Sequence, residues 1–395
     1  MSLVSLKDVS EIVRGVTFSK AEGSGTDTLG RIPVIRAGSI QRTLLVNEGQ
    51  IWVEESKVKE HQLIRKNDII MCTSSGSADL VGKCAISVDD HHVSFGAFCA
   101  GIRPNPTKVS PSYLYHFLNS PKFRNWTKNS SGANIKNIRA SELGDFKFEL
   151  PSLDEQKRIA ATLDKADAIR RKRQQAIQLA DDFLRSVFLD MFGDPVTNPK
   201  DFPIGTIRDF VETANYGSSG KASETEGEYP MLRMGNITYE GAWDFTNLKY
   251  IDLSEKDKPK YLTQKGDLLF NRTNSKELVG KTAVFEEEKP MAIAGYLIRV
   301  RTNELGNNYY LSGYLNSAHG KKTLVGMCKS IVGMANINAQ ELQNIKILLP
   351  PIELQNEFEM IVKTTKQKVK SFNRSSELLN DNFNSLSQKA FAGEL

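Results

Sequence analysis

The feature that most constrains the fold of this chain is a long apolar stripe between Leu153 and Met191. Steps of four and three residues along this segment reach apolar side chains throughout, except for Arg170 and Arg173 at its centre. That spacing is the repeat of about 3.5 residues that is typical of a coiled coil. A Pro-Ser pair precedes the segment, Gly-Asp-Pro follows it, and no Gly or Pro interrupts it. The sequence therefore predicts one long helix.

A second stripe of the same kind occupies residues 350 to 395. Its apolar positions include Leu354, Phe358, Val369 and Leu386, with a small stutter in the repeat near Thr365. A lone helix of this length cannot bury its stripe without a partner of similar length. We therefore expect the two helices to pair with each other.

The rest of the chain is a duplication in which one globular block precedes each helix. Segments of the first block return in the same order and at a nearly constant spacing in the second. IPVIRAGSI (32–40) matches YPMLRMGNI (229–237), KNDIIMCTSSGSADLVGK (66–83) matches KGDLLFNRTNSKELVGK (265–281), YLYHFLNS (113–120) matches YLSGYLNS (310–317), and NIRASELGDFKFELP matches NINAQELQNIKILLP.

Local patterns within the blocks indicate the α+β class. Short runs such as DIIMCT and SFGAFCAGI are rich in β-branched and aromatic residues and are bounded by turn residues, which favours strands. Residues 111 to 126, PSYLYHFLNSPKFRNW, indicate one helix opened by Pro and Ser. We expect globular domains at 1–150 and 196–349, with helical regions at 151–195 and 350–395.

Composition sets only broad limits. The 395 residues are 39% apolar and 25% charged, without a signal peptide or a long apolar run, so we expect a soluble, cytoplasmic protein with no membrane contact. The four cysteines lie far apart, which favours buried thiols over a zinc site. A net charge of +5 permits nucleic-acid binding and is also common in proteins that bind none.

The sequence carries no recognisable catalytic arrangement. It has no phosphate-binding P-loop, no Gly-x-Ser-x-Gly and no His-Glu-x-x-His, and YGSSGKAS (216–223) has too few residues between its glycines to hold a triphosphate. RPNP (103–106) lacks the aromatic residue of an amino-methyltransferase motif. His91 and His92 stand in a polar turn, which favours solvation over metal binding. We expect a binding protein without cofactor or metal, and not an enzyme.

Four further segments carry a family resemblance. They are the junctions LPSLDEQKRI and LPPIELQNEF, FLDMFGDPVTNP at the end of the first helix, and KAFAGEL at the end of the chain. Together with the duplicated plan, this pattern resembles the DNA specificity subunit (S subunit) of type I restriction-modification systems over nearly the whole chain. One departure is Leu354, which replaces the Glu expected before Gln355 and should weaken one local contact.

The resemblance implies a function and partners. Each block would be a target recognition domain that reads one half of a bipartite, non-palindromic double-stranded DNA sequence. The two helices would form an antiparallel coiled-coil spacer, related with the blocks by a pseudo-two-fold axis. Two methyltransferase subunits and two restriction (translocase-nuclease) subunits would be the partners, and S-adenosylmethionine, ATP and Mg²⁺ would belong to them.

Three loops in each block carry the side chains that base readout requires, chiefly Arg or Lys for guanine and Asn or Gln for adenine. In the first block the predicted DNA-binding residues are Arg36, Ser39, Gln41, Arg42, Thr73, Ser74, Ser75, Ser77, Lys128, Asn134 and Lys136. In the second they are Arg233, Asn236, Asn271, Arg272, Asn274, Ser275, Lys321, Lys322 and Asn336. The lysines are candidates for phosphate contacts. Any single residue could equally serve in an intramolecular hydrogen bond, and Arg36 and Arg233 favour a structural role because they recur.

Two other interpretations remain open at this point. The chain could be a detached recognition module of a related system in which recognition and enzyme are fused. It could also be a structural coiled-coil adaptor that does not read DNA. Copurification of a separate methyltransferase would distinguish the first from an S subunit, and DNA binding would exclude the second.

Overall fold

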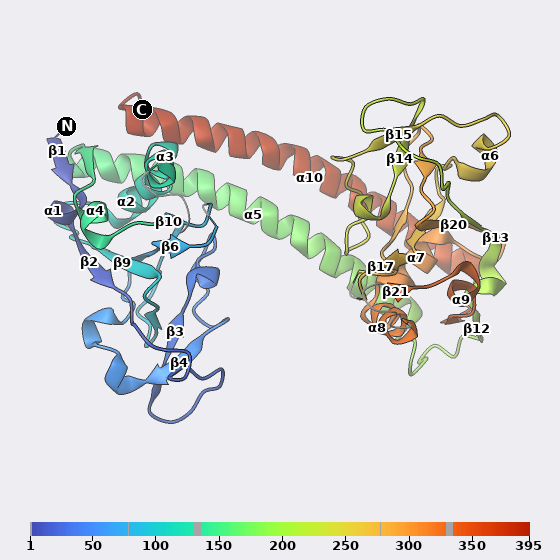
Figure 1. The fold of residues 1–395 in the computed structure, drawn as a ribbon, viewed down its shortest axis with the longest axis horizontal. Coiled ribbons are helices and arrows are strands. Elements are labelled where there is room, and N and C mark those ends of the chain that lie inside the picture. The colour runs from blue at the N-terminus through green and yellow to red at the C-terminus, as the bar shows by residue number, and fades with distance from the viewer. Residues whose placement is uncertain (1, 78, 130–135, 277, 329–334) are drawn as a thin grey trace. The chain divides into compact units, whose positions relative to one another are not determined.

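The computed structural model describes residues 2–77, 79–129, 136–276, 278–328 and 335–395 (Figure 1). The chain forms two compact units. Unit 1 comprises Met1–Gln174 and Arg374–Leu395, and unit 2 comprises Gln175–Asn373. Each unit thus contains one globular block together with part of each long helix.

Unit 1 contains eleven described strands and four short helices before the first long helix. The strands are β1 (Ser2–Ser5), β2 (Ser10–Arg14), β3 (Arg31–Ile35), β4 (Ile51–Glu54), β5 (Ile69–Cys72), β6 (Ser74–Ser75), β7 (Cys84–Ile86), β8 (Ser94–Phe95), β9 (Cys99–Pro104), β10 (Lys136–Asn137) and β11 (Lys147–Leu150). The helices are α1 (Leu6–Val9), α2 (Pro111–Leu118), α3 (Pro121–Asn129) and α4 (Ala140–Gly144).

Unit 2 repeats this series. Its strands are β12 (Ile204–Thr206), β13 (Val211–Tyr216), β14 (Tyr229–Leu232), β15 (Lys249–Ile251), β16 (Leu268–Asn271), β17 (Thr273–Asn274), β18 (Thr282–Val284), β19 (Ala292–Ile293), β20 (Leu297–Thr302), β21 (Ala335–Asn336) and β22 (Lys346–Leu348). Its short helices are α6 (Lys258–Tyr261), α7 (Asn308–Asn316), α8 (Ala318–Met327) and α9 (Ala339–Gln343).

The two units share one sheet topology. A four-stranded antiparallel sheet has the order β2-β9-β5-β7 in unit 1 and β13-β20-β16-β18 in unit 2. A three-stranded sheet, β4-β3-β8 or β15-β14-β19, has one parallel pair in each unit. The pairs β1-β11 and β10-β6 correspond to β12-β22 and β17-β21. The duplication predicted from the sequence is therefore confirmed strand by strand.

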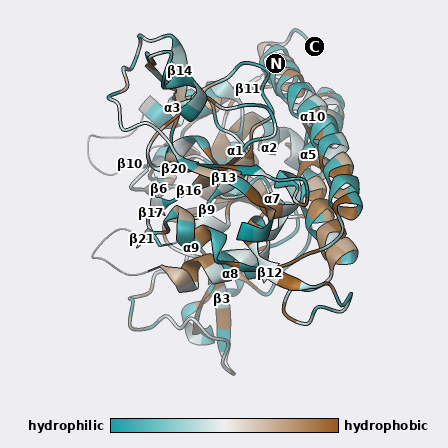
Figure 2. Cartoon of the chain, turned by 90° about the vertical axis from the view of Figure 1, so that its right-hand side faces the viewer, coloured by the Kyte–Doolittle hydropathy of each residue, from teal (hydrophilic) through white to brown (hydrophobic). Residues whose placement is uncertain are grey.

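The two long helices are α5 (Leu153–Phe192) and α10 (Ile352–Ala392), as the apolar stripes predict. They run antiparallel, because later positions on α5 contact earlier positions on α10. Within unit 1, Arg158 donates to the carbonyl oxygen of Leu395 at 2.6 Å, and Arg170 lies 4.2 Å from the ring centre of Phe383. Figure 2 shows hydrophobic and hydrophilic residues alternating along both helices.

Both helices contribute to the core of each unit. In unit 1, Leu163 of α5 and Ala390 of α10 belong to the same buried cluster as Phe117 and Phe148, whose rings stack with centres 4.5 Å apart. In unit 2, the ring centre of Phe188 on α5 lies 5.5 Å from that of Phe358 on α10, and the same ring stacks on Tyr310 of α7. The helices are thus core elements of the units as well as a connection.

A buried glutamine fixes the start of each long helix. The Oε1 atom of Gln156 accepts a hydrogen bond from the backbone N–H of Ser110 at 2.8 Å, and its Nε2 donates to the carbonyl oxygen of Pro151 at 2.9 Å. Gln355 repeats the pattern with Asn307 and Pro350, both at 2.9 Å. These contacts give the two junction segments a structural reason for their likeness.

Two details of the sequence interpretation change. Residues 111 to 126 form two helices instead of one, because Pro121 cannot continue α2 and opens α3. At the second junction, Leu354 packs against the core of unit 2. The equivalent Glu155 in unit 1 instead pairs with Arg158 at 2.7 Å, so the departure replaces an ion pair by apolar packing.

Candidate nucleic-acid interface

Three predicted loops meet at one edge of unit 1. The first loop (residues 36–42) follows β3, and the second (73–77) follows β5. Both line a hollow of about 640 Å³ that includes Arg36, Ser74 and Ser75. The third loop reaches the same place, because β10 pairs with β6 through Lys136 opposite Ser75. Loops that are far apart in the sequence therefore build one surface.

The second and third loops also meet in unit 2. Strand β17 pairs with β21, and the hydroxyl of Thr273 donates to Oδ1 of Asn336 at 3.0 Å. The backbone N–H of Ile337 donates to the carbonyl oxygen of Arg272 at 2.9 Å. Asn336 itself is exposed. The pairing places this asparagine and the second loop at one edge, as in unit 1.

Arg36 and Arg233 make intramolecular contacts of the kind that a structural role would require. Arg36 donates from Nη2 to the carbonyl oxygen of Gly49 at 3.4 Å. Arg233 donates in the same way to Asn247 at 2.9 Å. Each guanidinium thus bridges from the end of the inner strand to the segment before the next strand, and so closes the first loop.

Four predicted contact residues are buried, and their side chains form the intramolecular hydrogen bonds that were the alternative to DNA contact. Ser39 donates to the carbonyl oxygen of Glu48 at 3.2 Å and is 5% exposed. Thr73 donates to Phe98 at 3.1 Å. The side chains of Asn236 and Asn271 are buried as well, and Asn236 bridges Arg233 and Asp244. The sequence could not predict this, because short polar side chains close turns as readily as they contact a ligand.

The remaining candidates of unit 1 lie at least partly at the surface. Gln41 and Arg42 are exposed, and Gln41 accepts a hydrogen bond from Lys83 at 2.9 Å. Arg42 donates to Oε1 of Gln174 on α5 at 2.7 Å, which ties the first loop to the long helix. Ser77 is exposed, and Ser74 and Ser75 are half-buried.

The candidates of unit 2 that stay accessible are mostly half-buried. The guanidinium of Arg272 lies 4.7 Å from the ring centre of Tyr216. Oδ1 of Asn274 accepts the backbone N–H of Ser275 at 2.9 Å. Arg272, Asn274 and Ser275 are all half-buried. These side chains are held by the fold on one side and open to solvent on the other.

The lysines differ in their surroundings. Lys128 is exposed, with Nζ 3.7 Å from Asp79, and Lys322 is exposed as well. Lys321 donates to the carbonyl oxygen of Tyr239 at 3.0 Å and lies over that ring, and burial lowers the pKa of Lys321 to about 8. Asn134 lies outside the described residues, as does the side chain of Lys136.

Each second loop follows a strand that is held by a buried carboxylate. Asp68 accepts hydrogen bonds from Nε and Nη2 of Arg103 at 2.9 and 2.8 Å. Asp267 accepts the same pair from Arg301 at 2.7 and 3.1 Å. These bonds raise the pKa of the Arg103 and Arg301 guanidinium groups. They fix the turn from which β5 or β16 runs to the loop.

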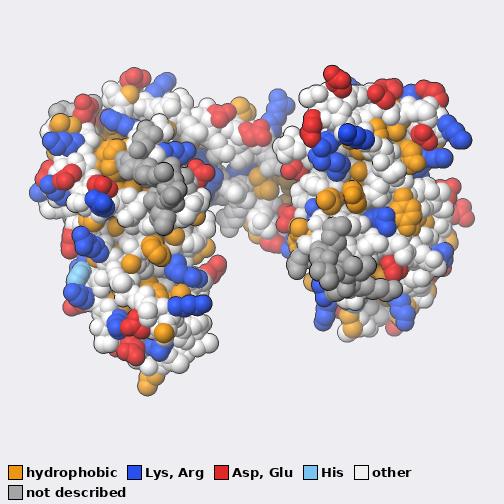
Figure 3. Space-filling view, in the orientation of Figure 1, with side chains coloured by type: hydrophobic (Ala, Val, Ile, Leu, Met, Phe, Trp, Pro, Cys, Tyr) orange, Lys and Arg blue, Asp and Glu red, His pale blue; other side chains and the backbone are white. Residues whose placement is uncertain are grey.

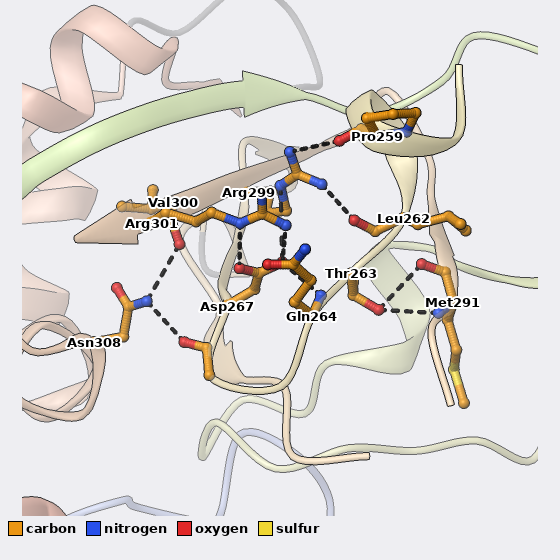
Figure 4. Close-up of polar contacts among 11 residues, drawn as sticks. Pro259, Leu262, Thr263, Gln264, Asp267, Met291, Arg299, Val300, Arg301 and Asn308 are labelled. Atoms are coloured by element: carbon orange, nitrogen blue, oxygen red, sulfur yellow. Dashed lines mark hydrogen bonds and ion pairs between the residues drawn. The ribbon is translucent and has the colours of Figure 1, made fainter. Parts of the chain in front are cut away.

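Unit 2 adds a second guanidinium to this arrangement (Figure 4). Arg299 is 2% exposed, lies 3.8 Å from Asp267, and donates to the carbonyl oxygens of Leu262 and, at 3.3 Å, Pro259. Burial lowers the pKa of Arg299. Gly101 of unit 1 occupies the equivalent strand position, opposite Ile70 as Arg299 is opposite Leu269. Arg299 thereby anchors α6, in whose place unit 1 has the 3-10 helix Glu60–Gln62.

Two exposed aromatic residues were missed by the sequence interpretation. Phe98 is 69% exposed and lines the hollow of unit 1, and Tyr296 is 52% exposed at the equivalent turn of unit 2. In the sequence, both residues directly follow Gly or Ala between two short predicted strands, and this pattern could have indicated an exposed turn. Such a residue reads equally well as the start of the next buried strand, which is how SFGAFCAGI was interpreted.

Charge and metal chemistry do not define this surface. Figure 3 shows positive and negative side chains interspersed on the visible face of each unit. Within the described ranges, no three His, Cys, Asp or Glu side chains group as a metal site would require. No described helix is long and apolar enough to cross a membrane.

Comparisons with known proteins agree with the duplicated fold. The chain is 28% identical to the type I restriction enzyme EcoKI specificity subunit of Escherichia coli K12, over 100% of this chain and 89% of that protein. It is also 28% identical to the StySPI specificity subunit of Salmonella potsdam, over 98% and 87%.

Solved structures show the same fold. A type I restriction-modification S subunit from M. genitalium superposes with a TM-score of 0.58 at 15% identity, over 99% of this chain and 96% of that one. A chain from a study of complex assembly and conformational transition of the type I R-M system gives 0.54 at 17% identity, over 100% and 98%. The family profile of the type I restriction modification DNA specificity domain matches residues 1–179 and again 199–386. This chain therefore belongs to the type I restriction-modification DNA specificity family, with two copies of its domain.

Proposed function

We propose that this chain is the sequence-specific DNA-binding subunit of a type I restriction-modification complex and that each unit reads one half of a bipartite, non-palindromic target. The observation that carries the proposal is the doubled fold with unlike loops. Both units place polar loops at the same edge of the same sheets, while the side chains on those loops differ, as Gln41 and Arg42 differ from Thr238 and Tyr239. Two such surfaces would read two different sequences.

The division of labour follows from this proposal. Residues 1–150 and 196–349 are the two target recognition domains, and residues 151–195 and 350–395 supply the spacer helices. Two methyltransferase subunits and two restriction subunits assemble on this chain in the cytoplasm. S-adenosylmethionine, ATP and Mg²⁺ bind to those partners, so this chain determines the target and catalyses nothing.

The exposure of the predicted DNA-binding residues reduces the number that could contact DNA. The four buried side chains, together with Arg36 and Arg233, support the loops, whereas the other exposed and half-buried side chains remain available for bases or phosphates. The proposed contacts are Gln41, Arg42, Ser74, Ser75, Ser77, Lys128, Arg272, Asn274, Ser275, Lys321, Lys322 and Asn336. Lys136 and Asn134 are retained from the sequence alone.

Reconstitution with the methyltransferase subunits tests the function. The complex should methylate one bipartite motif, identified by methylome sequencing, and the purified chain alone should transfer no methyl group. Gln41→Ala combined with Arg42→Ala should relax the first half-site only, while Lys322→Ala should weaken binding uniformly across sequences. Unchanged sequence preference in every loop variant would instead favour a structural adaptor without DNA readout.

A further inference from the structure

The two missed aromatic residues occupy equivalent and unusual positions. Phe98 and Tyr296 are 69% and 52% exposed, whereas the residues that follow them, Cys99 and Leu297, are buried at 2% and 0%. The chain thus turns one large ring outward immediately before a core strand in each unit. The two rings precede equivalent strands of the duplicated fold, β9 and β20, so they differ from apolar side chains scattered singly over a surface.

The backbone of each aromatic residue is bonded directly to a second loop. The carbonyl oxygen of Phe98 accepts the backbone N–H of Thr73 at 2.9 Å, and that of Tyr296 accepts the N–H of Arg272 at 3.0 Å. Each aromatic residue therefore lies directly beside the loop that carries the proposed base contacts. In unit 2, Tyr216 beside Arg272 is also 41% exposed, which adds a second aromatic surface.

The surroundings of Phe98 suit the edge of a base better than a phosphate. The hollow that it lines, of about 640 Å³, contains the hydroxyls of Ser74 and Ser75, one cation, Arg36, and one carboxylate, Glu48. Among the described residues that line the hollow, these two charges offset each other, so they supply no net positive charge to attract a phosphate. A ring next to hydroxyls instead offers apolar contact beside hydrogen bonds.

We propose that Phe98 and Tyr296 contact the 5-methyl group of a thymine, one in each half-site, and so read that base by apolar contact. This inference rests on the proposed function. In the major groove, thymine alone among the unmodified bases carries a methyl group, and apolar side chains recognise it. The hydroxyl of Tyr296 additionally allows a hydrogen bond to a neighbouring base edge, which Phe98 cannot form.

The test uses the reconstituted complex with its methyltransferase subunits and a library of duplexes randomised in each half-site. Phe98→Ala should lose preference for thymine at one position of the first half-site and leave the second half-site unchanged. Tyr296→Ala should do the converse. Tyr296→Phe should keep the thymine preference, because the ring alone contacts the methyl group.

Uracil isolates the methyl group itself. Replacing the critical thymine by uracil removes only that methyl, and we expect binding to weaken about fourfold, the worth of one buried methyl-sized group. Phe98→Ala should abolish this difference, because the contact is already lost. Val88→Ala in unit 1 and Leu305→Ala in unit 2 are matched controls, since both residues are exposed and lie elsewhere, and they should retain the parent preference.

The outcomes separate this inference from the proposed function. If the parent complex reads a bipartite target and both alanine variants keep every base preference, the aromatic inference is wrong and the function stands. If Phe98→Ala binds less tightly but still distinguishes thymine from uracil by the parent ratio, the ring does not contact the methyl group. If the parent complex shows no sequence preference, the proposed function itself fails.

Discussion

The two units have the same sheet topology but differ in the side chain at one strand position. At Gly101 of unit 1, an added Cβ would lie 2.8 Å from the ring of Phe95, so apolar packing leaves no room for a side chain. At the equivalent Arg299 of unit 2, a buried guanidinium shares Asp267 with Arg301 and holds two carbonyl groups. One fold thus tolerates either an apolar or a charged interior at this position, where Asp267 and two carbonyl oxygens face the buried guanidinium. The shared carboxylates and glutamines define the frame, and the loops are free to vary.

The largest difference between the units should appear when the carboxylates are neutralised. Asp267→Asn leaves two guanidinium groups without their charge partner, one of them buried, and should cost about 3–5 kcal/mol of unfolding free energy. Asp68→Asn removes the charge partner of one guanidinium only, that of Arg103, which is 17% exposed and also lies 3.8 Å from Glu11, and should cost about 2 kcal/mol. Denaturant unfolding of both variants measures this. A larger loss for Asp68→Asn would contradict the comparison.

The two junction glutamines, in contrast, should contribute equally to the unfolding free energy. Gln156→Ala and Gln355→Ala each leave a buried backbone N–H and carbonyl groups without a partner, which should cost about 2 kcal/mol in either unit. Gln340→Ala, at an exposed position in unit 2, should change the unfolding free energy by less than about 0.5 kcal/mol. A clear inequality between the two junction variants would show that the helices are anchored differently.

One pH-dependent contribution to stability is expected from Lys321 of unit 2. Burial lowers the pKa of Lys321 to about 8, while an unfolded lysine titrates near about 10.4. Between these values this lysine binds more protons in the unfolded chain, so its contribution to stability should rise with pH from about 8 to 10.4. Lys321→Arg stays charged and should remove this rise. Unit 1 has an arginine, Arg124, at the position equivalent to Lys321. Its side chain donates to the carbonyl oxygens of Val81 and Asp79.

The same loss of charge on Lys321 should also change DNA binding. Above pH 8 the neutral Lys321 can no longer attract a phosphate, so binding to the second half-site should weaken while binding to the first does not. Titration of the complex against duplexes that carry one intact half-site each would measure it. Equal weakening at both half-sites would assign the pH effect to another group.

The frame of this molecule was predictable from the sequence, whereas most of the site was not. The stripes of α5 and α10 and the four repeated segments record burial that both copies require, so periodicity and self-similarity reveal them. The roles of Ser39 and Asn236 depend on which carbonyl groups tertiary packing leaves nearby. The outward turn of Phe98 and the burial of Arg299 likewise result from contacts between distant segments, which no local pattern encodes.

The smallest expected effect is a change in the gap between the two half-sites when a spacer helix is lengthened. Four residues inserted after Gln174 add about 6 Å of helix and a rotation of about 40°. Because each base pair advances about 3.4 Å, the gap between half-sites should lengthen by about one or two base pairs, and the bases read should stay the same. Methylome sequencing of cells that carry the variant measures the gap. An unchanged gap with full activity would make the helices a docking surface only.

The most direct test of two independent readers is an exchange of one unit's block. Residues 204–349 are replaced by the corresponding block of another member of the family, and the methylated motif is determined with the parent's partner subunits. The account predicts that one half-site takes the donor's sequence while the other half-site stays as in the parent. A change in both half-sites, or in neither, would contradict it.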